Sequence, residues 1–395
     1  MSDVLRLGIA GLGVASTQIL PPISRLPFIK ITAAADLRAD ALAKFRETYK
    51  GETFASVEEM CASSNVDAIY VATPNQLHAQ HAITAANHKK HIIVEKPMAL
   101  SIEECKAMNE AAEKNLVNLL CGHTHSFDPP IRKIRDIVKS DELGKLCMLH
   151  SWNYNEFMYR PRMKHELATS HGVVLNQGPH HVDIVRLIGG GMVRSVRAMT
   201  GTWDKERAHE GSYTCYLEFE DGTPATLVYS GYGFFDTAEL FSWVGEGGQP
   251  REPATNLKVR KRLREVGSRE EEEQLKEGMR FGGQREGEFS HVSTGERKQP
   301  FFGFTLVSCE RGDIRQTPDG LFIYGETDKR EIPLEAGRRG REAEVEELYN
   351  AVVYNRPVFH DGRWGAATLE VCLAMLESAK QRKEIFLSHQ VPSPE

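Results

Sequence analysis

Short apolar runs alternate with amphipathic stretches over the first third of the chain. Runs rich in β-branched residues predict strands at 4–8, 31–35, 68–72, 92–95 and 117–121. Between them, apolar positions at helical spacing predict helices that include 56–63, 76–87 and 101–114. Because strands separated by helices need crossover connections, this pattern predicts an α/β domain with a parallel, doubly wound sheet.

Two local signals set limits on the predicted helices. Ser101 and Glu104 have the S-x-x-E spacing of a capping box, which predicts that a helix begins at Ser101. Pro21 and Pro22 fall inside the helix expected after the first strand. Because proline lacks a backbone donor, we expect a kink or an early end at this point.

The alternation of predicted strands and helices ends after about residue 122. Helices are predicted at 129–139 and 177–188 and strands at 145–153, 193–201, 212–219, 225–230, 239–244, 305–309 and 321–324, with closing helices at 342–354 and 364–383. Asp221-Gly222 and Pro318-Asp319-Gly320 are turn signals between neighbouring runs, which predicts antiparallel pairing. The sequence therefore predicts a doubly wound domain at 1–122 and an α+β domain at 123–395 with an open, mainly antiparallel sheet.

A charged insertion occupies about residues 245–300 of the second domain. Basic residues at 258–264 are followed by an acidic run at 270–273. The two runs cancel and aromatic residues between them are sparse, which argues against a nucleic-acid-binding segment. We interpret the insertion as solvated and partly helical, lying over the sheet or a neighbouring subunit.

Composition narrows the class of protein. The 395 residues are 41% hydrophobic and 26% charged, with a net charge of −6, which indicates a folded core and no general affinity for nucleic acid or anionic lipid. No apolar run approaches the roughly 18–20 residues of a membrane span, and the first residues are not typical of a secretory signal. Seven widely spaced cysteines without a C-x-x-C pair favour a reducing, cytoplasmic location.

A glycine-rich turn follows the first predicted strand. Gly11 and Gly13 supply the G-x-G of a dinucleotide fingerprint, with Ser16 at the third small position. Such glycines let a pyrophosphate approach the helix N-terminus, where free N–H groups favour anions. Asp36 ends the second strand twenty positions after Ser16, where a carboxylate that binds the adenosine ribose is expected. The sequence therefore predicts a Rossmann-type dinucleotide site.

Asp36 also bears on the choice of cofactor. A carboxylate accepts hydrogen bonds from ribose hydroxyls but repels a 2′-phosphate, so NAD is favoured over NADP. Arg38, two residues further on, either softens that repulsion or points to solvent. This alternative leaves NADP open.

Two loops follow later strands of the predicted parallel sheet. Thr73-Pro74-Asn75, with His78 nearby, comes after one strand, and Glu95-Lys96-Pro97 comes after the next. Ligands bind at the carboxyl ends of such strands, where a lysine can stabilise alkoxide charge, although a surface turn also fits Glu-Lys-Pro. The residues expected at the cofactor are Gly11, Leu12, Gly13, Val14, Asp36, Arg38, Thr73, Pro74, Asn75, His78, Glu95 and Lys96.

Four motifs together resemble a known family. They are Gly-Leu-Gly at 11–13, Thr-Pro with a histidine at 73–78, Glu-Lys-Pro at 95–97 and Gly-Pro-His-His-Val-Asp at 178–183. The combination resembles the glucose–fructose oxidoreductase/inositol dehydrogenase (Gfo/Idh/MocA) family over nearly the whole chain. Segments 159–162 and 175–186, with the insertion, are similar to its phthalate cis-dihydrodiol (4,5-dihydroxyphthalate) dehydrogenase branch.

The resemblance implies hydride transfer to NAD and assigns roles to named residues. Lys96 would hold the reacting hydroxyl, and His180 would accept its proton, since the pKa of an imidazole lies near working pH. Many relatives carry an aspartate four residues before this histidine. Here Asn176 stands at that position and cannot take a proton. His180 as an ordinary packing residue is the alternative, and His181 is expected to pack.

Basic residues near this motif suggest how a carboxylated substrate is held. The planar fork of arginine matches a carboxylate, which makes Arg160, Arg162 and Arg186 candidate substrate ligands, although a solvated basic loop also fits. His123 and His125 at alternate strand positions would share one side. They lack an acidic or thiolate partner at ligand spacing, so we expect no metal and place His123 at the substrate.

Four functions fit these residues. The first is an NAD-dependent dehydrogenase of a carboxylated cyclic cis-dihydrodiol, which becomes a catechol. The second is a sugar or cyclitol dehydrogenase, and the third is an NAD-dependent glycosidase that recycles its cofactor. The fourth, a nucleotide-sensing regulator, is opposed by the presence of Lys96 and His180. A small-molecule substrate is expected, and an open sheet that needs covering favours a homodimer or homotetramer through the C-terminal sheet.

Overall fold

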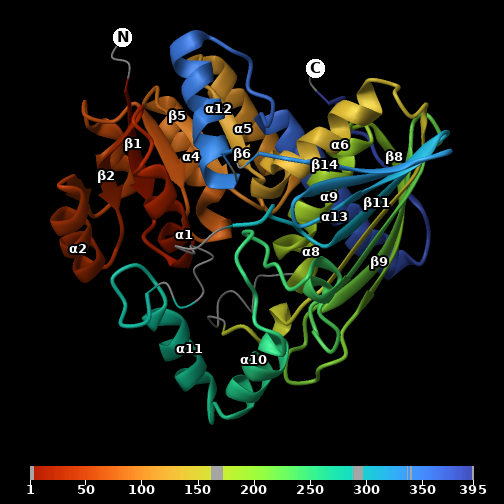
Figure 1. The fold of residues 1–395 in the computed structure, drawn as a ribbon. Helices are drawn as coiled ribbons and strands as arrows, with labels where there is room; N and C mark the ends of the chain where they lie inside the picture. The colour runs from red at the N-terminus through yellow and green to blue at the C-terminus, as the bar shows by residue number, and fades with distance from the viewer. Residues whose placement is uncertain are drawn as a thin grey trace. The chain divides into compact units, whose positions relative to one another are not determined.

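The computed structural model describes residues 4–161, 172–286, 288, 297–335, 337–338 and 340–393. The chain forms two compact units (Figure 1). Unit 1 comprises Met1–His123, Gln274–Ser290 and Gly340–Leu369, and unit 2 comprises Thr124–Glu273, His291–Arg339 and Glu370–Glu395.

Unit 1 contains the predicted parallel sheet. Its strands are β1 (Leu5–Ala10), β2 (Ile29–Ala35), β3 (Glu52–Phe54), β4 (Ala68–Val71), β5 (His91–Glu95) and β6 (Leu119–Gly122), in the order β3-β2-β1-β4-β5-β6. The connecting helices are α1 (Val14–Ile23), α2 (Ala39–Tyr49), α3 (Val57–Ala62), α4 (His78–Asn87) and α5 (Ile102–Asn115). Every strand pair is parallel, which confirms the doubly wound α/β prediction.

The structure agrees with the predictions made from the capping-box residues and from the two prolines. The Ser101 hydroxyl accepts from the Glu104 N–H at 3.2 Å, and α5 begins at the next residue. The Glu104 carboxylate reaches back to the N–H of Leu100, one residue before the position of a standard capping box. Helix α1 contains Pro21 and Pro22 and ends at Ile23, so the early end is confirmed.

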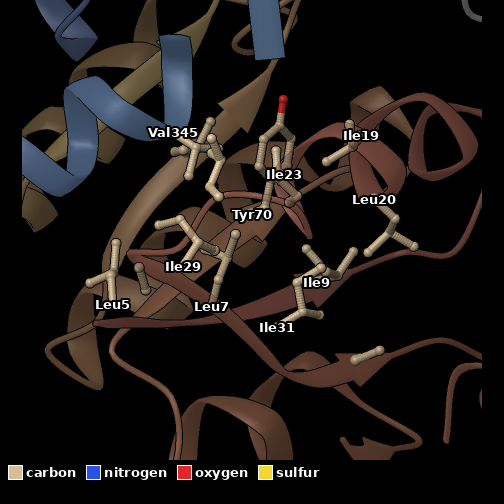
Figure 2. Packing of buried hydrophobic residues seen from close by; sticks show 14 of the residues in the cluster. Leu5, Leu7, Ile9, Ile19, Leu20, Ile23, Ile29, Ile31, Tyr70 and Val345 are labelled. Carbon is tan, nitrogen blue, oxygen red and sulfur yellow. The ribbon is translucent and has the colours of Figure 1, made fainter. Parts of the chain in front are cut away.

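The apolar core of unit 1 includes residues from distant parts of the chain. In Figure 2, Leu7 and Ile29 of the sheet pack below Val345 of α12 (Gly340–Tyr354). Phe281 and Leu348 join the same buried cluster. The division at residue 122 misses these two returns of the chain, because neither carries the strand–helix alternation of the first 122 residues.

Unit 2 contains one nine-stranded sheet. Its strands are β7 (Leu146–Tyr154), β8 (Val193–Gly201), β9 (Ser212–Phe219), β10 (Pro224–Ser230), β11 (Phe304–Cys309), β12 (Gly312–Gln316), β13 (Gly320–Gly325), β14 (Lys329–Pro333) and β15 (Ile385–Phe386). The order is β14-β13-β12-β11-β7-β10-β9-β8-β15, and only β10–β7 is parallel among these described pairs. The open, mainly antiparallel sheet is confirmed.

Helices of unit 2 include α6 (Pro129–Lys139), α8 (Gly172–Asn176) and α9 (Gly178–Ile188), and α13 (Gly362–Gln381) continues into it from unit 1. In Figure 1, α8 and α9 lie on the same side of the sheet. They contact β7, β9 and β10. The other face is partly exposed, with Met148, Trp152, Met199 and Tyr216 each 39–46% accessible.

One predicted strand, at 239–244, is wrong. The segment begins as a 3-10 helix, Thr237–Phe241, because the Asp236 carboxylate accepts from the Ala238 N–H and caps it. Ser242 and Trp243 then adopt left-handed backbone angles that no strand contains. Phe241 stacks on Phe301 at 4.2 Å, and its ring lies 6.2 Å from that of Phe304 in β11.

The charged insertion is partly helical, as expected. It forms α10 (Thr255–Arg264) and α11 (Arg269–Gly278). Arg260 of α10 donates to the carbonyl of Tyr232 and lies over the rings of Phe234 and Tyr159. Helix α10 therefore packs on loops of unit 2, whereas the sequence predicted contact with the sheet or with a neighbouring subunit.

Candidate active site

The glycine loop between β1 and α1 is shaped to receive a phosphate. Gly11 has φ of +91°, and a Cβ there would lie 2.7 Å from the Ala72 carbonyl oxygen, so a side chain is excluded. A Cβ on Gly13 would meet no atom within 4 Å. The N-terminus of α1, which begins at Val14, therefore opens onto space, and this cradle fits a dinucleotide pyrophosphate.

Asp36 is fixed at the end of β2 by backbone groups. Its two carboxylate oxygens accept from the N–H of Leu12 at 2.7 Å and of Arg38 at 2.8 Å. Each oxygen retains capacity for a further donor such as a ribose hydroxyl. The Arg38 guanidinium does not point to solvent, since Nη2 donates to the Leu12 carbonyl at 2.6 Å.

His78 ties together the loops that follow β4 and β5. It is buried, and its Nε2 and Nδ1 each lie 2.9 Å from a carbonyl oxygen, of Thr73 and Pro97 respectively. The Thr73 hydroxyl pairs with Nδ1 of His81 at 2.9 Å, while Pro74 precedes a 3-10 turn that begins at Asn75. The ring of His78 thus positions these loops, in place of the predicted direct cofactor contact.

Glu95 belongs to a buried group that we call the carboxylate cluster: Tyr70, Glu95, Arg341 and Glu344. The Tyr70 hydroxyl lies 3.2 Å from Glu95 and 2.9 Å from Glu344, and it accepts from Arg341 at 2.7 Å. Arg341 also pairs with both carboxylates. The Glu95 side chain is therefore committed to this cluster, which anchors the end of β5, and half-buried Lys96 follows it directly.

In unit 2, His180 lies on α9 among aromatic rings. Its ring forms a T-shaped pair with that of His125 at 4.9 Å, and the ring of Phe302 lies 5.4 Å away. His125 Nδ1 is 3.0 Å from the carboxylate of Asp128. We call His125, His180 and Phe302 the ring cluster. Asn176, at the end of α8, lies half-buried one helical turn before His180.

The predicted pair of histidines on one strand is not formed. Strand β6 ends at Gly122, and 124–127 form a 3-10 turn, so His123 and His125 do not alternate on a strand. His123 is buried in unit 1 with Nε2 3.6 Å from the Cys121 sulfur. Among the described residues, no group of histidine, cysteine and acidic side chains could hold a metal ion.

His181 packs, as expected for the second histidine of the motif. Its nitrogens lie 2.8 Å from the Tyr213 hydroxyl and 2.7 Å from that of Ser151. Burial lowers the pKa of His181 to about 3, so its ring is neutral at working pH. His181 is therefore a structural residue beside the candidate base.

The predicted arginines take different places. Arg186 is fully buried and donates to the Gln390 side chain and to the carbonyls of Gly191 and Val391, so it fastens the C-terminal tail and is removed from the substrate ligands. Burial lowers its pKa to about 10. Arg160 remains partly accessible, held by Glu156 at 3.2 Å. Arg162 lies outside the described residues.

A glycine cradle, a carboxylate at the end of β2 and a lysine at the end of β5 are the features expected of an NAD-binding oxidoreductase. The chain matches the family model of an oxidoreductase family with an NAD-binding Rossmann fold at residues 5–123. It also matches that of the GFO/IDH/MocA C-terminal domain at residues 131–249. The chain belongs to the GFO/IDH/MocA family and is an NAD(P)-dependent dehydrogenase.

The chain is also similar to individual dehydrogenases and to a solved structure. The chain is 34% identical to 1-carboxy-3-chloro-3,4-dihydroxycyclohexa-1,5-diene dehydrogenase of Comamonas testosteroni, over 95% of each protein. It is 28% identical to myo-inositol 2-dehydrogenase of Thermotoga maritima, over 61% of this chain and 74% of that protein. A solved structure of a proposed dehydrogenase from Bordetella bronchiseptica is 38% identical with a TM-score of 0.91, covering 97% of this chain and 100% of that one.

Proposed function

We propose that the protein oxidises a carboxylated cyclic cis-dihydrodiol, of the 4,5-dihydroxyphthalate type, to a catechol. The observation that carries this proposal is the similarity, over 95% of both chains, to a dehydrogenase whose name describes a carboxylated dihydroxycyclohexadiene. Oxidation of one carbinol carbon of such a ring gives an enone, which tautomerises to an aromatic ring. The overall reaction is therefore strongly favourable.

The roles of the residues follow from the chemistry of hydride removal. NAD, when bound, supplies the hydride acceptor. Lys96 donates a hydrogen bond to the reacting hydroxyl and stabilises the charge that develops on its oxygen. His180 accepts the hydroxyl proton, and Asn176 orients the substrate without taking a proton. Arg160 and Arg162 bind the substrate carboxylate, which their planar donors match.

A second candidate is oxidation of a cyclitol or sugar. It is supported by the similarity to a myo-inositol dehydrogenase, and it would use the same lysine and histidine. The two candidates differ in the charge of the substrate. A cyclitol offers no carboxylate, so Arg160 would then have no anionic ligand.

Substrate comparison tests the proposal. Purified protein and NAD are mixed separately with the cis-dihydrodiol of phthalate, myo-inositol, glucose and an aryl glycoside. We expect reduced nicotinamide to form with the dihydrodiol only. Formation with the polyols only would replace the proposal by the second candidate. Glycoside cleavage without net reduction would indicate a cofactor-recycling hydrolase, and binding without turnover would indicate a nucleotide sensor.

Variants of Lys96 and His180 test their roles. Lys96→Met and His180→Asn should each lower turnover by about 10²–10⁴-fold, the range for loss of a charge-stabilising donor or of a proton acceptor, and leave NAD affinity broadly unchanged. Steady-state kinetics and NAD titration measure both effects. The matched control is Lys106→Met, an exposed position on α5. Near-normal turnover in either variant rejects the assigned role.

We also propose that two or four copies assemble through the exposed face of the unit 2 sheet, in a cytoplasmic protein. Trp152 and Tyr216 on this face are each 42% exposed, and aromatic residues are enriched in subunit interfaces. Figure 1 shows the sheet as open. Among the described residues, no helix is both long and apolar enough to cross a membrane. Light scattering of Trp152→Glu against the parent chain tests the assembly.

A further inference from the structure

The charged insertion returns to the nucleotide-binding unit within α11, at Gln274. We call residues 279–286 the return segment; they belong to unit 1. Phe281 is 3% exposed, and its ring lies 6.3 Å from that of Tyr49 on α2, inside the buried apolar cluster of that unit. The segment is therefore docked by a buried side chain.

The backbone of the return segment touches the glycine loop. The Phe281 N–H donates to the carbonyl of Gly13 at 3.4 Å. The Phe281 carbonyl accepts from Nη2 of Arg38 at 3.1 Å. One residue of the insertion thus contacts both the phosphate cradle and the basic side chain that follows Asp36.

Charged contacts hold the segment from the other side. Glu286 pairs with Lys44 of α2 and accepts from the N–H of Gly282 at 3.0 Å. The Lys44 ammonium also lies 5.4 Å from the centre of the Phe281 ring. The turn is closed on itself and tied to α2, which fixes the direction of the Phe281 carbonyl.

Arg38 is therefore held between two backbone carbonyls. Its Nη2 donates to Leu12 and to Phe281, and its Nε lies 3.5 Å from Asp36. Asp36 itself is fixed by two backbone N–H groups. A guanidinium with these partners must give up hydrogen bonds before it can turn to an added phosphate.

We propose that the return segment determines which dinucleotide the protein binds, by holding Arg38 so that Asp36 meets the 2′ position of the adenosine ribose. A carboxylate at that position accepts from the 2′-hydroxyl of NAD and repels the 2′-phosphate of NADP. Arg38 is the cation that could offset this repulsion, and Phe281 keeps it on the carbonyl of the glycine loop. The insertion is thus a specificity element of the cofactor site.

Binding measurements without substrate test this inference, so its failure is distinct from failure of the proposed reaction. The dissociation constants of NAD and NADP are measured by calorimetry on the full chain. The parent chain should prefer NAD by at least about tenfold, and Phe281→Ala should lower the ratio of the NADP to the NAD constant by about tenfold, as expected for release of one charge-assisted hydrogen bond. Lys261→Gln, on the exposed face of α10, should leave the ratio unchanged.

A double variant identifies Arg38 as the residue released. In Phe281→Ala combined with Arg38→Gln, the gain in NADP binding should disappear. Equal affinity of the parent chain for both dinucleotides, an equal change of both constants in Phe281→Ala, or a gain that survives Arg38→Gln would overturn the proposal. If circular dichroism shows that Phe281→Ala is unfolded, Lys44→Met with Glu286→Gln loosens the same segment and is judged by the same ratio.

Discussion

The carboxylate cluster of unit 1 precedes Lys96 in the chain, and the ring cluster of unit 2 contains His180. The two clusters differ in the kind of side chain that builds them. In the first, Glu95 and Glu344 share one guanidinium and one hydroxyl. In the second, His180 meets the rings of His125 and Phe302. Nearby carboxylates favour a cation, whereas a ring-lined, water-poor surrounding disfavours one.

The difference in surrounding side chains corresponds to the different roles proposed for Lys96 and His180. A lysine that stabilises an alkoxide acts through its positive charge, and the proposed Lys96 directly follows Glu95, which shares Arg341 with a second carboxylate. A histidine that accepts a proton acts through its neutral ring, and the proposed base His180 packs against the rings of His125 and Phe302. The two candidate catalytic groups thus adjoin different kinds of side chain, carboxylates before Lys96 in sequence and aromatic rings around His180.

Removal of Arg341 from the carboxylate cluster should have the largest effect on stability. Arg341→Met leaves two buried carboxylates without their guanidinium, and we expect a loss of about 3–5 kcal/mol in the free energy of unfolding of unit 1. Urea titration of the variant measures it. The control, Arg363→Met, removes an exposed pair with Glu113 and should change stability by at most about 1 kcal/mol. Equal losses in the two variants would show that the cluster does not depend on Arg341.

His181, whose ring lies 5.9 Å from that of Phe302 in the ring cluster, should make the stability of the protein depend on pH. Burial lowers the pKa of His181 to about 3, below its ordinary value of 6.5, so between these values the unfolded chain binds a proton that the folded chain does not. Stability is fully present above pH 6.5 and is lost as the pH falls toward 3. Between pH 7 and 5.5 we expect a loss of about 1 kcal/mol.

His181→Gln isolates this contribution. The variant is less stable at neutral pH, but its urea midpoint should fall less than that of the parent chain between pH 7 and 5.5. Identical slopes in the two proteins would contradict the assignment of the titration to His181.

Trimming one ring should have the smallest effect. Phe302→Leu removes the ring contacts to His125 and His180, and aromatic pairs contribute about 0.5–1.5 kcal/mol each beyond buried area. Thermal unfolding should show a small loss, and the imidazole proton resonances of both histidines should shift. Phe386→Leu, at an exposed ring, should move neither histidine. Unshifted histidine resonances in Phe302→Leu would mean that the ring does not shape their environment.

Local signals in the sequence predicted much of the fold. The limits of α6, β8 and β9 agree with the predicted ones. Helix α6 begins with two prolines, β8 ends at Gly201, and β9 is followed by the Asp221-Gly222 turn. The segment 239–244 failed because Asp236, a capping residue upstream, overrides the strand propensity of the aromatic residues that follow. A hydrogen bond from a capping side chain can outweigh the strand propensity of a segment of only a few residues.

The candidate site was predictable only where a motif marks it. Motifs mark Lys96 and His180 as candidates, and their roles stay predictions. Arg341, Glu344 and Phe302 lie far along the chain, and no motif relates them to Glu95 or His180. Arg186 was misplaced although a signal existed. It lies six residues after His180, and helix positions share a face at spacings of three or four. Its side chain accordingly meets the C-terminal tail instead.

The returns of the chain to unit 1 also bear on how this protein is made. Phe281, Val345 and Leu348 fill the hydrophobic interior around β1, yet they leave the ribosome long after the first sheet has emerged. Part of the apolar surface of the nascent sheet therefore stays uncovered until late in translation. A gene fragment that stops near residue 122 would encode that unsealed intermediate, prone to aggregate, and could not serve as a transplantable cofactor module.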